Sequence, residues 1–73
     1  MGRLSGISGR AAVAAFGRAG FAFLRQKGSH AVLAKKGCPN LVIPLHRSVA
    51  PFLLRSQIRR AGLTEDEFIE LLH

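Results

Sequence analysis

The sequence has very few acidic residues: it contains four Asp and Glu in 73 residues, and all four lie in the last ten positions. Residues 1–63 carry all eleven Lys and Arg and no carboxylate, and the formal net charge of the chain is +7. A basic body without internal carboxylates indicates a polyanionic ligand, most plausibly nucleic acid. An acidic protein partner would satisfy the same charge, so both interpretations stay open here.

Cysteine is also scarce, since Cys38 is the only one in the chain. A single cysteine excludes a disulfide framework and a cysteine-based zinc site. The shortage of carboxylates argues against a magnesium or calcium cage, so we expect no metal and no cofactor. A reducing, cytoplasmic setting fits best. We expect no membrane span, because Arg10, Arg18 and Arg25 interrupt the apolar N-terminal region.

The length predicts a single domain over residues 1–73, with residues 1–7 as a flexible N-terminal segment. Apolar residues make up 48% of the chain, which is enough for a globular core. A domain this short buries only about 60% of the surface of its unfolded chain and is marginally stable alone. A permanent partner would therefore not be surprising for a chain of this length.

A helix is predicted over about residues 9–19. Ser8 is a good N-cap, Gly20 is placed to end the helix, and the apolar residues between them follow the spacing of one helix face. These apolar residues are Ala12, Val13, Phe16 and Ala19.

Three strands are predicted to follow, over residues 21–27, 29–35 and 41–45, joined by short links as an antiparallel meander. In the first, Phe21, Phe23 and Arg25 are expected on one face. Pro44 predicts that the third strand lies at a sheet edge. These strands are apolar on both faces, so the face without helices is expected to be covered by a partner or by self-association.

Two further helices complete the predicted order. Pro51 suits the first position of a helix that ends at Gly62. The segment Thr64–Glu67 has the sequence of a capping box, and Leu63 and Phe68 are placed as its hydrophobic staple. The fold class is therefore α+β, with the order helix, three strands, helix and short helix.

The segment Arg25–His30 carries the most specific chemistry in the sequence. An imidazole titrates near neutral pH and can take a proton from one oxygen and give one to another. RNA brings its own nucleophile, the 2′-hydroxyl, so an RNase needs only acid–base groups and cations that stabilise the negative charge on phosphorus. His30 is the candidate catalytic residue, with Arg25, Lys27 and Ser29 as phosphate-binding candidates. Judged by residue chemistry alone, an ordinary surface histidine at a strand start is the more common identity.

The other candidate functional residues can also be explained by ordinary structural roles. Arg55 and Arg59, on the predicted 51–62 helix, are candidates for contacts with the phosphate backbone, although the solvated side of a helix looks the same. His46 could be a second acid–base group, but a turn histidine is its more usual identity. Cys38 precedes a proline in a turn, and no role is expected for it.

Several short stretches, taken in order, resemble one known family, the HicA toxins of bacterial toxin–antitoxin systems. The resemblance is collinear from about residue 7 to the end of the chain. The matching stretches are Ser8-Gly9-Arg10, Ala19-Gly20-Phe21, Arg25-Gln26-Lys27-Gly28-Ser29-His30, Ile43-Pro44-Leu45-His46, Leu54-Arg55-Ser56, Ala61-Gly62-Leu63-Thr64 and Glu67-Phe68-Ile69-Glu70-Leu71-Leu72.

The resemblance implies a fold like a double-stranded-RNA-binding domain, with helices on one face of a three-stranded antiparallel sheet. It implies ribosome-independent cleavage of mRNA, for which the histidine of the Gly-Ser-His motif, here His30, is essential. It also implies a HicB-like antitoxin that binds the toxin in a hetero-oligomer and shields this residue. Two alternatives stay open: a non-catalytic RNA-binding module on the same fold, and a small basic protein that docks an acidic protein partner.

The sequence departs from the family at the start of the helix after the third strand. Family members usually carry Gly-Thr-Leu there, whereas this chain has Phe52-Leu53-Leu54. Backbone amides at a helix N-terminus are a natural phosphate site. The change removes a glycine and a hydroxyl that would help to form one.

Overall fold

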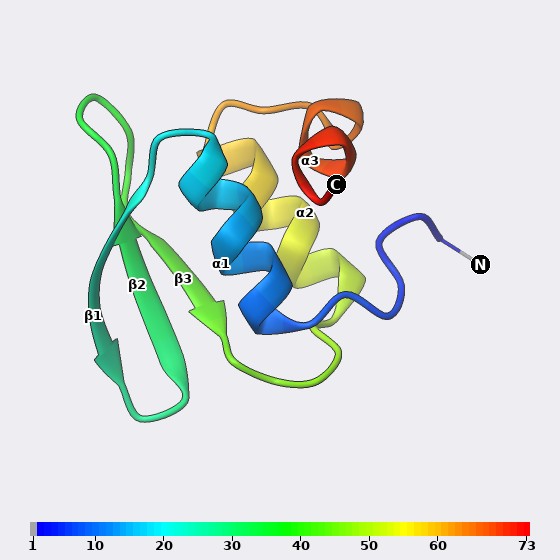
Figure 1. Cartoon of the computed structure of the whole chain (residues 1–73), viewed down its shortest axis with the longest axis horizontal. Coiled ribbons are helices and arrows are strands. Elements are labelled where there is room, and N and C mark those ends of the chain that lie inside the picture. Colours follow the sequence, from blue (N-terminus) through cyan, green and yellow to red (C-terminus); the bar gives the residue numbers. More distant parts are fainter. Residues whose placement is uncertain (1) are drawn as a thin grey trace.

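The chain folds into one small sheet with helices on one side of it (Figure 1). The computed structural model describes residues 2–73, and in this range it has three helices and three strands. In chain order these are α1 (Gly9–Arg18), β1 (Ala22–Lys27), β2 (His30–Ala34), β3 (Leu41–Pro44), α2 (Pro51–Arg60) and α3 (Glu65–Leu71). The predicted α+β fold of the double-stranded-RNA-binding-domain type is confirmed.

The helix α1 forms because its sequence supplies both a start signal and an apolar face. The Ser8 hydroxyl accepts a hydrogen bond from the Ala11 amide at 3.1 Å, so Ser8 is the predicted N-cap. Ala12 and Phe16 are fully buried on the inner face. The helix ends where the Phe21 amide donates to the Phe16 carbonyl at 3.0 Å, across the turn at Gly20.

The sheet has the strand order β1-β2-β3, and both pairs are antiparallel. β3 lies at an edge, as Pro44 predicted. The predicted faces of the first strand are partly wrong, because a register shift interrupts β1 between Phe23 and Arg25. One extra residue in a strand reverses the alternation of side chains beyond it. Phe23 therefore shares the side of Leu33, whereas Arg25 lies opposite Val32 on the other side of the sheet.

The helices cover one face of the sheet and leave the other uncovered (Figure 1). On the covered face, α1 contacts β1 and β3, and α2 contacts β3. α3 packs on α1 and α2 rather than on the sheet. We call the uncovered side the open face; it carries Arg25, Lys27, His30, Val32 and Val42. Val42 is 44% exposed there, which agrees with the predicted apolar surface on this side.

The core lies between the covered face of the sheet and the helices, and it consists of apolar side chains. The largest fully buried ones are Phe16, Phe68, Leu4, Leu33, Leu41, Ile43, Leu54 and Val49. No polar or charged residue within residues 2–73 is buried. Over the same residues, no helix combines the length and the apolar character that crossing a bilayer requires.

The N-terminal segment contributes to this core. Leu4 and Ile7 are buried, and the Val49 amide donates to the Ile7 carbonyl at 2.8 Å. The sequence predicted flexibility for residues 1–7, and that stays a prediction. The side chains of Leu4 and Ile7 nevertheless pack in the same core as residues of the helices.

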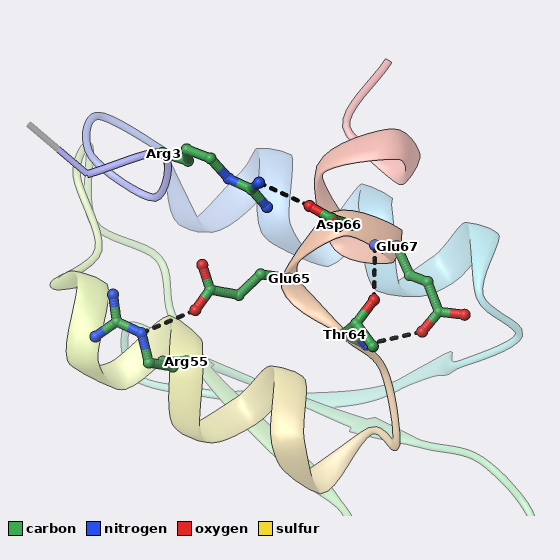
Figure 2. Close-up of polar contacts among 6 residues, drawn as sticks. All are labelled: Arg3, Arg55, Thr64, Glu65, Asp66 and Glu67. Atoms are coloured by element: carbon green, nitrogen blue, oxygen red, sulfur yellow. Dashed lines mark hydrogen bonds and ion pairs between the residues drawn. The ribbon is translucent and has the colours of Figure 1, made fainter.

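The C-terminal helix is fixed by the predicted capping box (Figure 2). The Thr64 hydroxyl accepts from the Glu67 amide at 3.1 Å, and the Glu67 carboxylate accepts from the Thr64 amide at 2.8 Å. Phe68 packs against Phe16 with ring centroids 5.0 Å apart. Arg18 closes the other end by donating to the Leu71 carbonyl.

Candidate functional site

The turn between β1 and β2 is held by two hydrogen bonds, one on each side. The Gln26 side-chain amide donates to the Gly28 carbonyl at 2.9 Å. The Leu45 amide, just after β3, donates to the Ser29 carbonyl at 2.6 Å. Gly28 has a φ of 60°, in the left-handed region that glycine adopts without strain. The turn that precedes His30 is therefore tied to its own strand and to β3.

His30 is the first residue of β2 and lies between the two other strands. It is opposite Lys27 of β1 and opposite Pro44 of β3. Directly opposite residues of an antiparallel pair share a face, with Cβ atoms about 4.5–5.5 Å apart. The side chains of His30 and Lys27 therefore start next to each other on the open face, and both residues are exposed.

The bulge in β1 brings a second cation to this face. Without the extra residue between Phe23 and Arg25, Arg25 would lie on the covered side with Phe23. With it, Arg25 is opposite Val32, two positions from Lys27 on the same strand and the same face. The structure thus brings together three predicted site residues, Arg25, Lys27 and His30, with Ser29 in the adjoining turn.

The start of α1 packs closely against the end of β3, next to the residues that hold the β1–β2 turn. The Gly9 amide donates to the His46 carbonyl at 2.9 Å. A Cβ atom at Gly9 would overlap the Pro44 carbonyl oxygen and lie 2.7 Å from the Leu45 Cα atom. Glycine is therefore required for α1 to begin against the residues that hold Ser29.

The cations of the chain fall into two groups. Five contact other groups of the protein: Arg3 pairs with Asp66 at 2.7 Å, Arg55 pairs with Glu65 at 3.1 Å, and three others donate to main-chain carbonyls, namely Arg18, Lys35 and Arg60. Figure 2 shows the two ion pairs, which join the N-terminal segment and α2 to the acidic first turn of α3. Within residues 2–73 the other six make no such contact, and two of them, Arg25 and Lys27, lie on the open face beside His30. The remaining four are Arg10, Lys36, Arg47 and Arg59.

The predicted phosphate contacts of Arg55 and Arg59 belong to a different surface. Both residues are on α2, which packs on the covered side of the sheet, and Arg55 is engaged by Glu65. The structure does not bring them together with His30. Their contact with RNA stays a prediction.

Two residues that position the site were not among the predicted site residues. Gln26 holds the Gly28 carbonyl, and Gly9 permits the contact between α1 and β3. Both residues lie inside stretches that carry the family resemblance. The resemblance therefore marked them, but residue chemistry alone assigned them no role. No cluster of three or more His, Cys, Asp or Glu that could hold a metal ion occurs in the part of the chain that the structure describes.

Comparison with protein families identifies one match. The model of the HicA toxin of bacterial toxin–antitoxin systems matches residues 9–63, which is more than half of the chain. The chain belongs to the HicA toxin family. A search of curated proteins found no match.

Membership in the HicA family makes this chain a toxin of a toxin–antitoxin system and implies a HicB-type antitoxin as its partner. The match covers the whole site, from Gly9 through the β1–β2 turn to the end of α2. It stops at Leu63, so the resemblance noted for residues 67–72 lies outside it.

Proposed function

We propose that this HicA toxin is an endoribonuclease that cleaves mRNA without the ribosome and without a metal ion, with His30 as its acid–base residue. The observation that carries the proposal is the arrangement of His30 directly opposite Lys27 on an exposed sheet face, with Arg25 on the same face. No carboxylate occurs in residues 1–63 to neutralise these cations. An RNA strand laid on the open face would meet an imidazole and two free cations together.

The reaction uses the 2′-hydroxyl of the substrate as nucleophile. His30 takes the proton of this hydroxyl, and the oxygen forms a bond to the adjacent phosphorus. The P–O5′ bond then breaks, and the departing O5′ receives a proton from the imidazolium. The products are a 2′,3′-cyclic phosphate and a 5′-hydroxyl end, and neither a water molecule nor an external nucleophile is consumed.

Lys27 and Arg25 have a different task in this mechanism. Negative charge develops on the two non-bridging oxygens as the phosphorus becomes five-coordinate, and fixed cations that face these oxygens lower the barrier. Lys27 lies nearest to His30 in the strand register, so we assign it to the scissile phosphate. Arg25, opposite Val32, is assigned to the neighbouring phosphate. Ser29 could donate a hydrogen bond from the turn.

The substrate gives a direct test of this chemistry. The toxin is incubated, in the presence of a chelator, with an RNA and with the same sequence carrying 2′-O-methyl groups throughout. We expect cleavage of the RNA alone, with cyclic phosphate and 5′-hydroxyl ends identified by mass spectrometry. Cleavage of the methylated strand, or 5′-phosphate ends, would contradict the assignment of the 2′-hydroxyl as nucleophile.

The same experiment separates the proposal from a non-catalytic binding module. Such a module would bind both strands and cleave neither, and its affinity would fall steeply as salt is added. A protein that only docks an acidic partner would show no affinity for either strand.

A further inference from the structure

The two edges of the sheet differ in how far they are protected. At β3 the Val42 amide donates to the Gln57 side chain at 3.0 Å, and Pro44 has no amide hydrogen. Arg60 covers the adjoining Asn40 carbonyl at 2.9 Å. β3 is therefore closed to a further strand by α2.

The outer edge of β1 has no such protection. All six residues of β1 are exposed, and in the described part of the chain β2 is the one strand that pairs with it. Figure 1 shows β1 at the outer side of the sheet, away from α2 and α3. An edge strand presents a row of unpaired amides and carbonyls, which is a template for another strand.

A groove runs beside this edge on the covered side of the sheet. It has a volume of about 300 Å³ and lies between α1 and β1. Its walls are mainly apolar, and the lining residues are Arg10, Val13, Ala14, Phe23, Gln26 and Leu45. Phe23 is 55% exposed here although it faces the helices, because α2 packs over β3, at the other edge of the sheet.

The geometry of a strand added to β1 follows from these surroundings. Its side chains would alternate between the two sides of the sheet. One set would enter the groove beside Phe23 and Val13. The other set would lie on the open face beside Arg25 and Lys27.

Charge decides what kind of strand fits. A second copy of β1 would place Arg25 and Lys27 against the same two cations, and like charges opposite one another destabilise a strand pair. Carboxylates at those positions would instead be attracted to two cations that no group within residues 2–73 neutralises. Self-pairing is therefore disfavoured and an acidic partner is favoured.

We propose that the outer edge of β1 binds an extended segment of a partner protein as a fourth strand, and that this segment alternates apolar and acidic residues. The apolar residues fill the groove between α1 and β1, and the acidic residues pair with Arg25 and Lys27. Main-chain hydrogen bonds would supply the affinity and the alternation the specificity. The antitoxin that family membership implies is the first protein in which to seek such a segment.

The proposal is tested by NMR on the isotope-labelled full chain. The probe is a synthetic peptide that alternates glutamate and valine, and the control peptide has the same composition with the glutamates grouped at one end. We expect chemical-shift changes and slowed hydrogen exchange at the β1 amides with the alternating peptide. We expect the double variant Arg25→Glu/Lys27→Glu to weaken its binding by at least about tenfold, because attraction becomes repulsion.

Two further variants test the groove and control for the change of charge. Val13→Asp places a charge in the groove and is expected to weaken binding as well. Arg59→Glu, a charge reversal on exposed α2, is the matched control for each of the single variants Arg25→Glu and Lys27→Glu, and it should leave binding unchanged.

Three outcomes would overturn the proposal. They are no shift at the β1 amides up to millimolar peptide, equal binding of the grouped peptide, and protection of the β1 edge by single-stranded RNA but not by the peptide. RNA cleavage is measured on the same samples. If the protein cleaves RNA but does not bind the peptide, only the docking proposal is wrong. If it binds the peptide but does not cleave RNA, only the proposed ribonuclease activity is wrong.

Discussion

At Gly9, the start of α1 lies directly against the backbone at the end of β3. Its amide binds the His46 carbonyl, and the space where a side chain would begin is filled by the backbone of Pro44 and Leu45. The same backbone holds the Ser29 carbonyl in the turn before His30. A change at Gly9 would therefore reach the site through the main chain.

We predict that Gly9→Ala destabilises the fold by about 1–3 kcal/mol or more, because the new methyl group must displace main-chain atoms rather than a flexible side chain. Thermal and chemical unfolding measure this. Gly17→Ala in the same helix is the matched control, since nothing lies within 4 Å of its added Cβ atom. That control should raise the free energy of unfolding by up to about 1 kcal/mol through helix propensity. Equal stability of the two variants would contradict the close approach.

At the residue scale, the sequence predicts which residue types form the site better than it predicts which face of the sheet each side chain lies on. The position of His30 at a strand start, next to Lys27 and after a glycine turn, could be predicted from the order of residue types. The face of Arg25 could not, because it depends on the extra residue between Phe23 and Arg25. A β-bulge has no fixed residue signature at this position, and one bulge reverses every side chain beyond it.

At the scale of elements, α3 shows how a very short helix persists. It has seven residues, far fewer than an isolated helix needs in water. Its capping box satisfies the first turn, its acidic first turn suits the positive end of the helix dipole, and Phe68 anchors it against Phe16. The ion pairs of Arg3 and Arg55 add exposed contacts of small energy.

The contribution of the Thr64 cap to the stability of the fold can be measured directly. We predict that Thr64→Ala lowers the free energy of unfolding by about 1 kcal/mol, because the Glu67 amide loses its acceptor. Thr64→Ser keeps the hydroxyl and should retain most of the stability, as followed by urea unfolding. If both variants lose the same amount, the methyl group and not the hydrogen bond would account for the effect of Thr64.

The elements that the sequence predicts most accurately are those with local signals. The caps at Ser8 and Thr64 and the proline at position 51 each mark a helix start, and all three appear in the structure. Strand ends are less accurate: the first strand begins at Ala22 instead of residue 21, and the third ends at Pro44 instead of residue 45. Strand ends depend on partners elsewhere in the chain, which no local pattern contains.

At the scale of the whole molecule, the sequence could not show which Lys and Arg side chains contact other groups of the protein and which do not. Composition showed a basic chain, but not that Arg55 pairs with Glu65, nor that two of the six cations without such a contact in residues 2–73, Arg25 and Lys27, lie on the open face. The acidic residues concentrate in α3, on the helical side of the molecule, and there they neutralise cations. The open face keeps its positive charge, as a surface for a polyanion requires.

The uncovered sheet face also has a consequence at this scale. Helices cover one side of the sheet (Figure 1), and His30, Lys27 and Arg25 lie exposed on the other side. The HicA family implies a HicB-type antitoxin as the partner of this toxin. The outer edge of β1 is the place where we propose that a partner segment binds.

The most direct test of the account is a comparison of RNA cleavage by the parent protein and its His30→Ala variant, with a chelator present. His30 is exposed, so the variant should keep the fold, which circular dichroism verifies. We predict that the cleavage rate falls by at least about 100-fold, as expected for the loss of an acid–base group. The control variant His46→Ala should cleave at nearly the parental rate. A folded His30→Ala protein that cleaves RNA as fast as the parent would contradict the central claim.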